Sequence, residues 1–181
     1  MREKEAPREL PGDLAGCRAA LTGSTVGRNR GRRVVRAVLG DAVCYAKFFS
    51  RPKWADLVRN LATRPRAFSQ AEREWRVARL LQAAGIATVV PLAYGHRTLL
   101  GLERESLFLS RETAGPTLGQ LLRRRRAAAG PAGAPPPEFL APLIDLLRTL
   151  LARGLYLPDL SLEHILVSAA GSFRLLDLHN G

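Results

Sequence analysis

The sequence of 181 residues has few cysteines and no long apolar run. Its two cysteines, Cys17 and Cys44, form no CxxC pair and no metal-ligand spacing, which indicates reduced thiols of a cytosolic protein. No apolar stretch approaches the roughly 18 residues that a membrane-spanning helix needs. Residues 1–15 are charged and lack the apolar centre of a signal peptide. Any membrane contact is therefore expected to be peripheral.

Acidic residues are scarce relative to basic ones. Lys+Arg 28 against Asp+Glu 16 gives a formal charge of +12, and beyond the first five positions the only lysines are Lys47 and Lys53. Such a surface attracts phosphate-rich partners: nucleic acid, an anionic membrane face or a phosphorylated glycolipid. The sequence lacks the interleaved aromatic residues that stack on bases, so a nucleic-acid-binding module ranks last. The hydrophobic content of 46% is enough for one domain or two small lobes.

The N-terminal part reads as a loose arm, a loop and a hairpin. Residues 1–16 have mixed charge with prolines, and residues 23–33 are Gly-rich and basic, which predicts a loop. The β-rich runs 34–39 and 42–49 flank Gly40 and Asp41, a hairpin signal. Lys47 lies within the second of these runs.

A helix and further strands are expected next. Apolar residues recur at helical spacing over residues 66–84, and Gly85 is a suitable end. Residues 86–94 are β-rich. Runs 98–102 and 106–110 predict a second hairpin, with Glu103, Arg104 and Glu105 at its turn.

The remaining chain is predicted to be mainly helical until its last part. A linker over 111–116 precedes a helix over 117–126, which ends in a run of four arginines. Residues 127–137 are of low complexity and predict a mobile surface loop. A strong amphipathic helix is expected over 138–153. Two short apolar runs around a turn then form the last hairpin, within residues 155–180.

This last hairpin is tied to two carboxylates and a histidine. Asp159 precedes the first run by six residues, Asp177 ends the second, and His164 adjoins the first. Asp159 could accept a hydroxyl proton in phosphoryl transfer, and Asp177 could hold Mg²⁺. A lone histidine is more often structural, and the spacing from Asp159 makes a metal-binding role an equal alternative.

Lys47 and Glu74 have the residue types of a phosphate clamp. A lysine on a strand neutralises nucleotide phosphates, and a glutamate on the following helix fixes that lysine by ion pairing. Taken singly, each residue has an ordinary alternative. Lys47 alone reads more readily as an ordinary lysine of a strand, and Glu74 alone as a solvated side chain on a helix flank. The apolar neighbours of Lys47 suggest a buried strand, in which a lysine needs a partner or a functional reason. The pair gains weight from the downstream hairpin.

Five motifs occur in order along the sequence: CYAKFF, AEREW, GIATVVPLAYG, DLSLEHILV and LLDLHN. Together they resemble the lipopolysaccharide kinase family (the WaaP/InaA group). The family consists of bacterial kinase-like enzymes that phosphorylate heptose or Kdo sugars of the lipopolysaccharide inner core. His164, and Leu178-His179 after Asp177, resemble the heptose kinases in particular. The resemblance covers about residues 25–181.

The resemblance implies an α+β, protein-kinase-like fold and ATP-dependent transfer to a sugar on the cytoplasmic side of the inner membrane. Residues 17–110 would be a β-rich N-lobe with one helix, 111–116 a hinge, and 117–181 a partial, mainly helical C-lobe with a catalytic hairpin. The implied partners are ATP, Mg²⁺ and an anionic glycolipid acceptor.

The resemblance also implies a role for each candidate site residue. Lys47 would bind phosphates and Glu74 would pair with it. Asp159 would be the catalytic base, and His164 and Asp177 would flank Mg²⁺. The backbone from Glu112 to Ala114 would contact adenine, and the segment from Gly27 to Gly31 would cover the phosphates.

Departures from the kinase pattern leave alternatives open. Leu157 stands where many kinases have His, Ser161 where protein kinases have a phosphate-binding Lys, and the chain ends four residues after Asp177. A C-terminally short lobe is therefore expected. A nucleotide-binding pseudokinase is the main alternative, and a kinase acting on a small molecule or a protein is another.

Overall fold

A computed structural model describes residues 13–29, 31–50, 69–99, 102–129, 137–168 and 171–176. The chain divides into two compact units. The first comprises Met1–Trp75 with Val90–Glu112, and the second comprises Arg76–Val89 with Thr113–Gly181. None of the described helices is long and apolar enough to cross a membrane.

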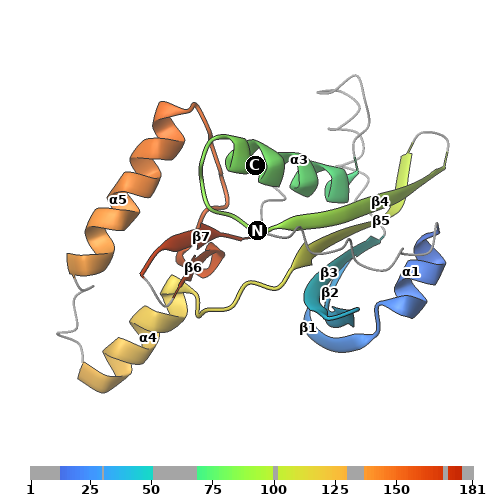
Figure 1. Ribbon diagram of the computed structural model, residues 1–181, viewed down its shortest axis with the longest axis horizontal. Helices are drawn as coiled ribbons and strands as arrows, with labels where there is room; N and C mark the ends of the chain where they lie inside the picture. The colour runs from blue at the N-terminus through green and yellow to red at the C-terminus, as the bar shows by residue number, and fades with distance from the viewer. Residues whose placement is uncertain are drawn as a thin grey trace. The chain divides into compact units, whose positions relative to one another are not determined.

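The first unit is built on a five-stranded antiparallel sheet with the order β1-β2-β3-β5-β4 (Figure 1). Its strands are β1 (Gly23–Asn29), β2 (Arg32–Leu39), β3 (Ala42–Ser50), β4 (Pro91–Leu99) and β5 (Leu102–Arg111). The hairpin predicted over 34–39 and 42–49 is confirmed as β2 and β3. Its turn is closed by Gly40 at φ 60°, a conformation that glycine adopts without steric cost.

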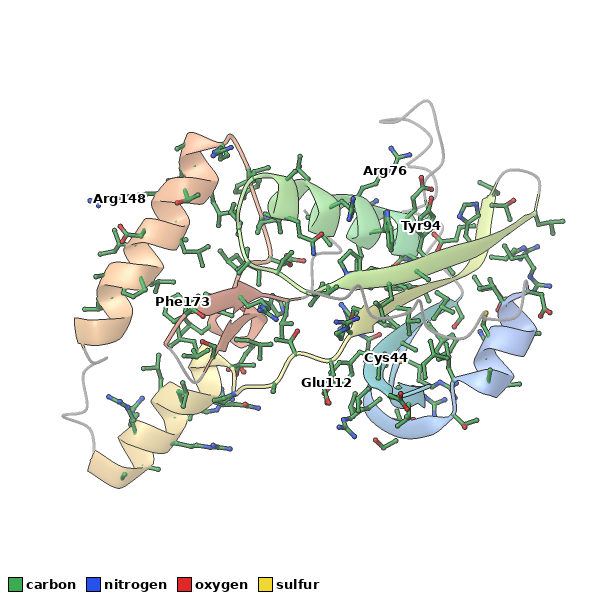
Figure 2. All side chains as sticks on the ribbon, in the orientation of Figure 1. Cys44, Arg76, Tyr94, Glu112, Arg148 and Phe173 are labelled. Carbon is green, nitrogen blue, oxygen red and sulfur yellow. The ribbon has the colours of Figure 1, made fainter. Side chains whose placement is uncertain are left out.

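One face of this sheet is covered by helix α1 (Leu14–Ala20), whose first turn is capped by the Asp13 carboxylate accepting from the Gly16 N–H at 2.7 Å. The core beneath it consists of Cys17, Leu21, Val35, Ala37, Cys44, Ala46, Phe48, Leu107 and Leu109. Both cysteines lie in this core as thiols outside any disulfide, and burial raises their pKa. Cys44 is labelled among the sheet side chains in Figure 2.

Three predictions for this unit were wrong. The arm predicted over 1–16 overlaps α1, which begins at Leu14. The loop predicted over 23–33 contains strand β1, which forms because its backbone pairs with β2. The turn predicted at residues 103–105 lies inside β5, and β4 and β5 are each longer than the predicted runs.

Helix α3 (Gln70–Ala83) shows the predicted apolar periodicity, with Ala71, Ala78 and Leu81 fully buried. Gly85, at φ 76°, follows its end and supplies the left-handed conformation that terminates helices. The described residue Ser69 precedes the helix, which starts at Gln70. Residues 51–68, which include positions 66–68 of the predicted helix, lie outside the described part of the chain.

The second unit contains helices α4 (Leu118–Ala129) and α5 (Pro137–Ala152), the short helix η1 (Leu162–His164) and the hairpin β6 (Ile165–Val167) with β7 (Phe173–Leu175). The predicted helices and terminal hairpin are thus confirmed within a few residues. Leu175 also exchanges backbone bonds with the 87–89 segment, donating to Ala87 at 3.0 Å and accepting from Val89 at 3.3 Å. Of the loop predicted over 127–137, the first three residues belong to α4, which reaches Ala129, and Pro137 begins α5. Residues 130–136 lie outside the described residues.

Candidate active site

Lys47 and Glu74 form an ion pair within the first unit. The Lys47 Nζ donates to Glu74 Oε2 at 2.8 Å. Lys47 lies on the face of β3 opposite the α1 core, between the buried residues Phe48 and Ala46 along the strand. Glu74 lies one turn into α3. The structure therefore brings together the two residues that the sequence suggested as a phosphate clamp.

The two members of the pair differ in exposure. The side chain of Lys47 is 14% exposed, and that of Glu74 is 1% exposed. The second carboxylate oxygen, Glu74 Oε1, is buried without a hydrogen-bond partner among the described residues. A buried carboxylate is costly unless it is paired. The ion pair with Lys47 offsets part of the free-energy cost of burying the Glu74 carboxylate.

The Glu112 carboxylate is held by side chains of the sheet. Arg36 on β2 donates from Nε to Oε1 at 2.6 Å and from Nη2 to Oε2 at 2.9 Å. The Tyr45 hydroxyl donates to Oε1 at 3.1 Å. The hydrogen bonds from Arg36 are the main reason that the pKa of Glu112 is below its usual value. Glu112 follows the last residue of β5 and is labelled in Figure 2.

One backbone group of Glu112 is already used in a hydrogen bond within the sheet. Its N–H donates to the Val43 carbonyl at 2.9 Å, so this donor belongs to the sheet. If the 112–114 segment contacts adenine, the contact must use other backbone groups, such as the Glu112 carbonyl. Ala114, the other residue predicted there, is exposed and belongs to the second unit.

Gly27 and Gly31 both lie in the β1–β2 hairpin. Gly27 pairs with Val34 next to a β-bulge at Val26. Gly31 has φ 94°, and its carbonyl accepts from the Ser50 N–H at 2.7 Å. The segment predicted to cover the phosphates thus begins in strand β1, and Gly31 supplies a left-handed conformation directly before β2.

Asp159 and His164 are joined within the second unit. The carboxylate-bearing residue Asp159 is exposed in a turn, and its backbone carbonyl lies 2.7 Å from His164 Nδ1. A carbonyl oxygen only accepts hydrogen bonds, so Nδ1 must carry the proton. In the neutral ring the lone pair is then on Nε2, which is the atom able to bind a cation. The His164 carbonyl in turn accepts from the Leu176 N–H at 2.8 Å, at the end of β7.

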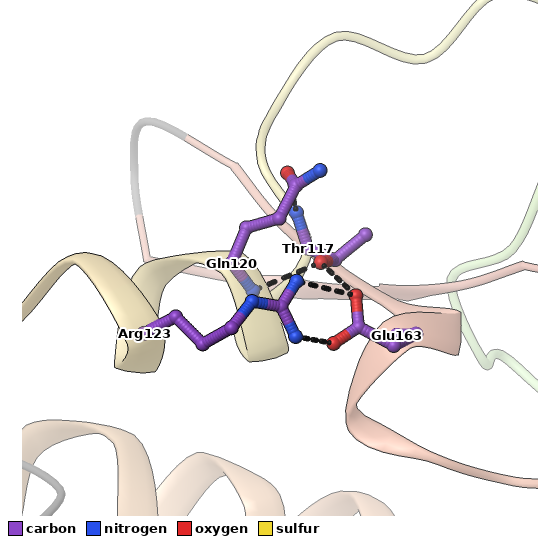
Figure 3. A network of polar contacts seen from close by, with 4 residues as sticks. All are labelled: Thr117, Gln120, Arg123 and Glu163. Atoms are coloured by element: carbon purple, nitrogen blue, oxygen red, sulfur yellow. Dashed lines mark hydrogen bonds and ion pairs between the residues drawn. The ribbon is translucent and has the colours of Figure 1, made fainter. Parts of the chain in front are cut away.

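A carboxylate next to His164 anchors this segment to α4 (Figure 3). Glu163 accepts from both terminal nitrogens of Arg123, and its Oε2 accepts from the Thr117 hydroxyl at 2.9 Å. Thr117 and Gln120 cap the start of α4 reciprocally, each backbone N–H donating to the other's side chain at 3.1 Å. These contacts hold the pKa of Glu163 below its usual value, with the Arg123 hydrogen bond the largest cause.

Glu163 approaches α4 closely at a glycine. A Cβ at Gly119 would lie 2.0 Å from Glu163 Oε1. The sequence analysis did not single out Glu163 or Gly119. The sequence does show that Glu163 stands beside the candidate His164. Its partners Arg123 and Thr117 lie 40 and 46 residues earlier in the chain, so no local pattern indicates these contacts.

Asp177 lies outside the described residues. Within the described part of the chain, no group of three or more His, Cys, Asp or Glu residues is arranged to hold a metal ion. The side chain of His164, a predicted ligand, offers a nitrogen, whereas Mg²⁺ prefers oxygen ligands. The described residues therefore do not by themselves form a magnesium site, and Asp177 would have to supply the carboxylate.

Solved structures show which class of fold this is. A structure titled "WaaP in complex with acyl carrier protein" matches with a TM-score of 0.64 and 22% sequence identity, over 94% of this chain and 66% of that chain. This likeness establishes a kinase-type fold of mixed α/β structure with an antiparallel sheet.

The family follows from the sequence comparisons. A family model, described as the lipopolysaccharide kinase (Kdo/WaaP) family, matches residues 17–181. The chain belongs to this family. A curated relative, lipopolysaccharide core heptose(I) kinase WaaP of Pseudomonas aeruginosa, is 27% identical over 171 residues, covering 88% of this chain and 62% of the relative. The chain thus spans less than two thirds of that relative's length.

Proposed function

We propose that the protein is an ATP-dependent phosphotransferase that acts on an inner-core sugar of lipopolysaccharide, heptose or Kdo. Membership in the lipopolysaccharide kinase family supports this function. The observation that carries it is the buried Lys47–Glu74 ion pair, which presents a fixed ammonium group from β3. A fixed cation of this kind is what binding of nucleotide phosphates requires.

The proposed reaction assigns one role to each candidate group. The acceptor hydroxyl oxygen forms a bond to the γ-phosphorus of ATP, the bond from that phosphorus to the β–γ bridging oxygen breaks, and ADP leaves. The Asp159 carboxylate accepts the hydroxyl proton. Lys47 binds phosphate oxygens, and Glu74 holds Lys47 in place. The β1–β2 hairpin with Gly27 and Gly31 covers the phosphates.

The metal and the adenine contacts complete the proposal. Asp177 and His164 would hold Mg²⁺, which when bound neutralises charge on the transferred phosphate. The segment from Glu112 to Ala114 would be the hinge, using backbone groups other than the Glu112 N–H. Residues 17–110 would correspond to a kinase N-lobe, and residues 117–181 to part of a C-lobe.

The net positive charge of the protein supports an anionic glycolipid as the acceptor. A formal charge of +12 suits an anionic glycolipid and a peripheral contact with the cytoplasmic face of the inner membrane. The exposed arginines of α4, residues 123–126, contribute to that basic surface.

The test is a transfer assay with γ-labelled ATP, Mg²⁺ and purified core acceptor lacking the phosphate. We expect the wild-type chain to label the acceptor, and Asp159→Asn to bind ATP normally but to transfer at least about a hundredfold more slowly, as expected for loss of a general base. Binding of ATP by the wild type without transfer would instead favour a pseudokinase. Full transfer by Asp159→Asn would show that the assigned base is wrong.

A further inference from the structure

The first turn of α3 is held by side chains. The Gln70 N–H donates to both carboxylate oxygens of Glu103, at 3.2 and 3.1 Å. The Ala71 N–H donates to Ser106 Oγ at 3.3 Å, and the Glu72 N–H to Ser69 Oγ at 3.1 Å. The first N–H groups of a helix have no partner within the helix, so these bonds supply what α3 lacks. Two of the three acceptors come from β5.

Glu103 is unusual for a capping residue because it is buried. It is 6% exposed, and Ser106, which is 1% exposed, donates its hydroxyl to Glu103 Oε1 at 2.5 Å. Burial raises the pKa of Glu103, while the bonds from Ser106 and Gln70 oppose that shift. The negative charge lies at the positive end of the helix dipole. The reaction proposed above makes no use of this carboxylate.

A β-bulge aims Glu103 at the helix. Arg97 of β4 pairs with Glu105, and the next residue, Thr98, pairs with Glu103. Arg104 is therefore an extra residue in β5. An extra residue reverses the alternation of side chains between the two faces of a strand. Glu103 and Ser106, three residues apart, consequently point to the same face and bond to each other.

The same strand also sets the position of Lys47. Strand β5 pairs with β3, and Lys47 is opposite Phe108 in that register. Glu74 is four residues after Gln70, one helical turn from the capped N–H. Strand β5 therefore fixes both ends of the ion pair: Lys47 through the β3 register, and Glu74 through the anchored first turn of α3.

We propose that Glu103 is a positioning residue for the Lys47–Glu74 clamp, acting by fixing the start of α3 against β5. This inference rests on the proposed function, because it names a residue that would tune nucleotide binding at the same site. Glu103 acts through Glu74 and touches neither nucleotide nor acceptor.

The test measures Mg-ATP affinity by calorimetric titration of the full chain. Glu103→Ala should weaken ATP binding about tenfold, a coupling in the range found for residues linked through a shared contact. Glu105→Gln, two residues along β5, changes a carboxylate that pairs with Arg18 and Arg97 and should alter affinity less than about twofold. In a Glu74→Gln background, Glu103→Ala should cause little further loss. Equal losses in both backgrounds, or wild-type affinity in a folded Glu103→Ala protein, would overturn the inference.

A second variant and a set of melting temperatures complete the test of the positioning role. If Glu103→Ala does not fold, Ser106→Ala removes one bond to the helix and one to Glu103 and should weaken ATP binding in the same direction, with the same dependence on Glu74. The melting temperatures of the four proteins of the cycle, measured without nucleotide, should be non-additive if Glu103 positions Glu74. Non-additive melting with no ATP binding by the wild type would contradict the proposed function alone, and additive melting would contradict the positioning role.

Discussion

Lys47 Nζ lies 2.8 Å from Glu74 Oε2, but the carboxylate is sealed from solvent while the lysine is 14% exposed. The two charges of the pair therefore differ in their access to solvent. Its negative end is fixed inside the first unit, and its positive end retains access to the surface. A buried charge that loses its partner is more costly than an exposed one, because it cannot recover hydration. This difference in exposure predicts which substitution in the pair lowers the stability of the protein more.

Lys47→Met should destabilise the protein more than Glu74→Gln. The first change leaves the 1%-exposed carboxylate without its partner, and breaking a buried pair in this way costs about 3–5 kcal/mol. The second leaves a lysine that can shift toward solvent. Urea unfolding of both variants measures the difference. Arg97→Met, at an exposed ion pair with Glu105, serves as a control and should change stability by less than about 1 kcal/mol. A larger loss for Glu74→Gln would contradict this ordering.

Gly119→Ala should stabilise the protein by less than the about 0.5–1 kcal/mol that this change ordinarily gives inside a helix. The new Cβ would lie 2.0 Å from Glu163 Oε1, at the end of an exposed side chain, and would displace that carboxylate from Arg123 and Thr117. Thermal unfolding measures the effect.

The double variant Gly119→Ala with Glu163→Ala separates the collision from other effects. With the Glu163 carboxylate removed, alanine at position 119 should regain its ordinary helix preference. An equally small gain from Gly119→Ala in the Glu163→Ala background would show that the cause lies elsewhere.

Glu103 should make stability fall as pH rises. Its pKa is raised in the folded protein, mainly by burial, so folding favours the protonated carboxyl. The unfolded state loses this proton near the ordinary value of 4.5, and the folded state loses it at higher pH. The contribution of this group to stability is therefore fully present below the unfolded pKa and is lost as pH rises through the folded pKa. The free energy of unfolding of wild type minus that of Glu103→Gln, measured from pH 4 to 8, should decline. A flat difference would contradict the raised pKa.

His164→Asn should shift metal preference in the transfer assay. The proton on Nδ1 is fixed by the Asp159 carbonyl, so in the proposed metal site the donor atom of His164 would be a nitrogen. Imidazole suits transition metals better than it suits Mg²⁺, and the amide oxygen of asparagine suits Mg²⁺. The ratio of activity with Mn²⁺ to activity with Mg²⁺ should thus be lower in His164→Asn than in wild type. An unchanged ratio would indicate that His164 does not contact the metal.

Sequence patterns predicted the elements whose signals are local. Alternating β-rich runs around Gly40 and Asp41 specified the β2–β3 hairpin, and apolar spacing specified α3. Strand β1 has no such pattern, because its residues are mostly exposed and it is a strand through pairing with β2. Helix α1 has seven residues, too few to be stable alone, and depends on burying Cys17 in the sheet core.

Of the contacts at the candidate site, sequence reasoning predicted the Lys47–Glu74 ion pair, because a charged residue in an apolar setting needs an oppositely charged partner. A lysine within an apolar strand needs a counter-charge, which led to Glu74. Glu103 was missed because it begins the charged run Glu103-Arg104-Glu105, a local composition typical of a turn. Its burial is decided by Gln70, 33 residues earlier in the chain, and by a bulge that no local pattern announces.

The bulge at Arg104 lets the cap of α3 form although Glu103 and Ser106 are an odd number of residues apart. Without this one exposed residue, Glu103 would stand two positions before Ser106, and regular alternation would still place both side chains on the same face of β5. A variant lacking Arg104 would therefore keep Lys47, Glu74 and Glu103, and also the bond that joins strand to helix. A single-codon deletion at this position should leave the clamp intact.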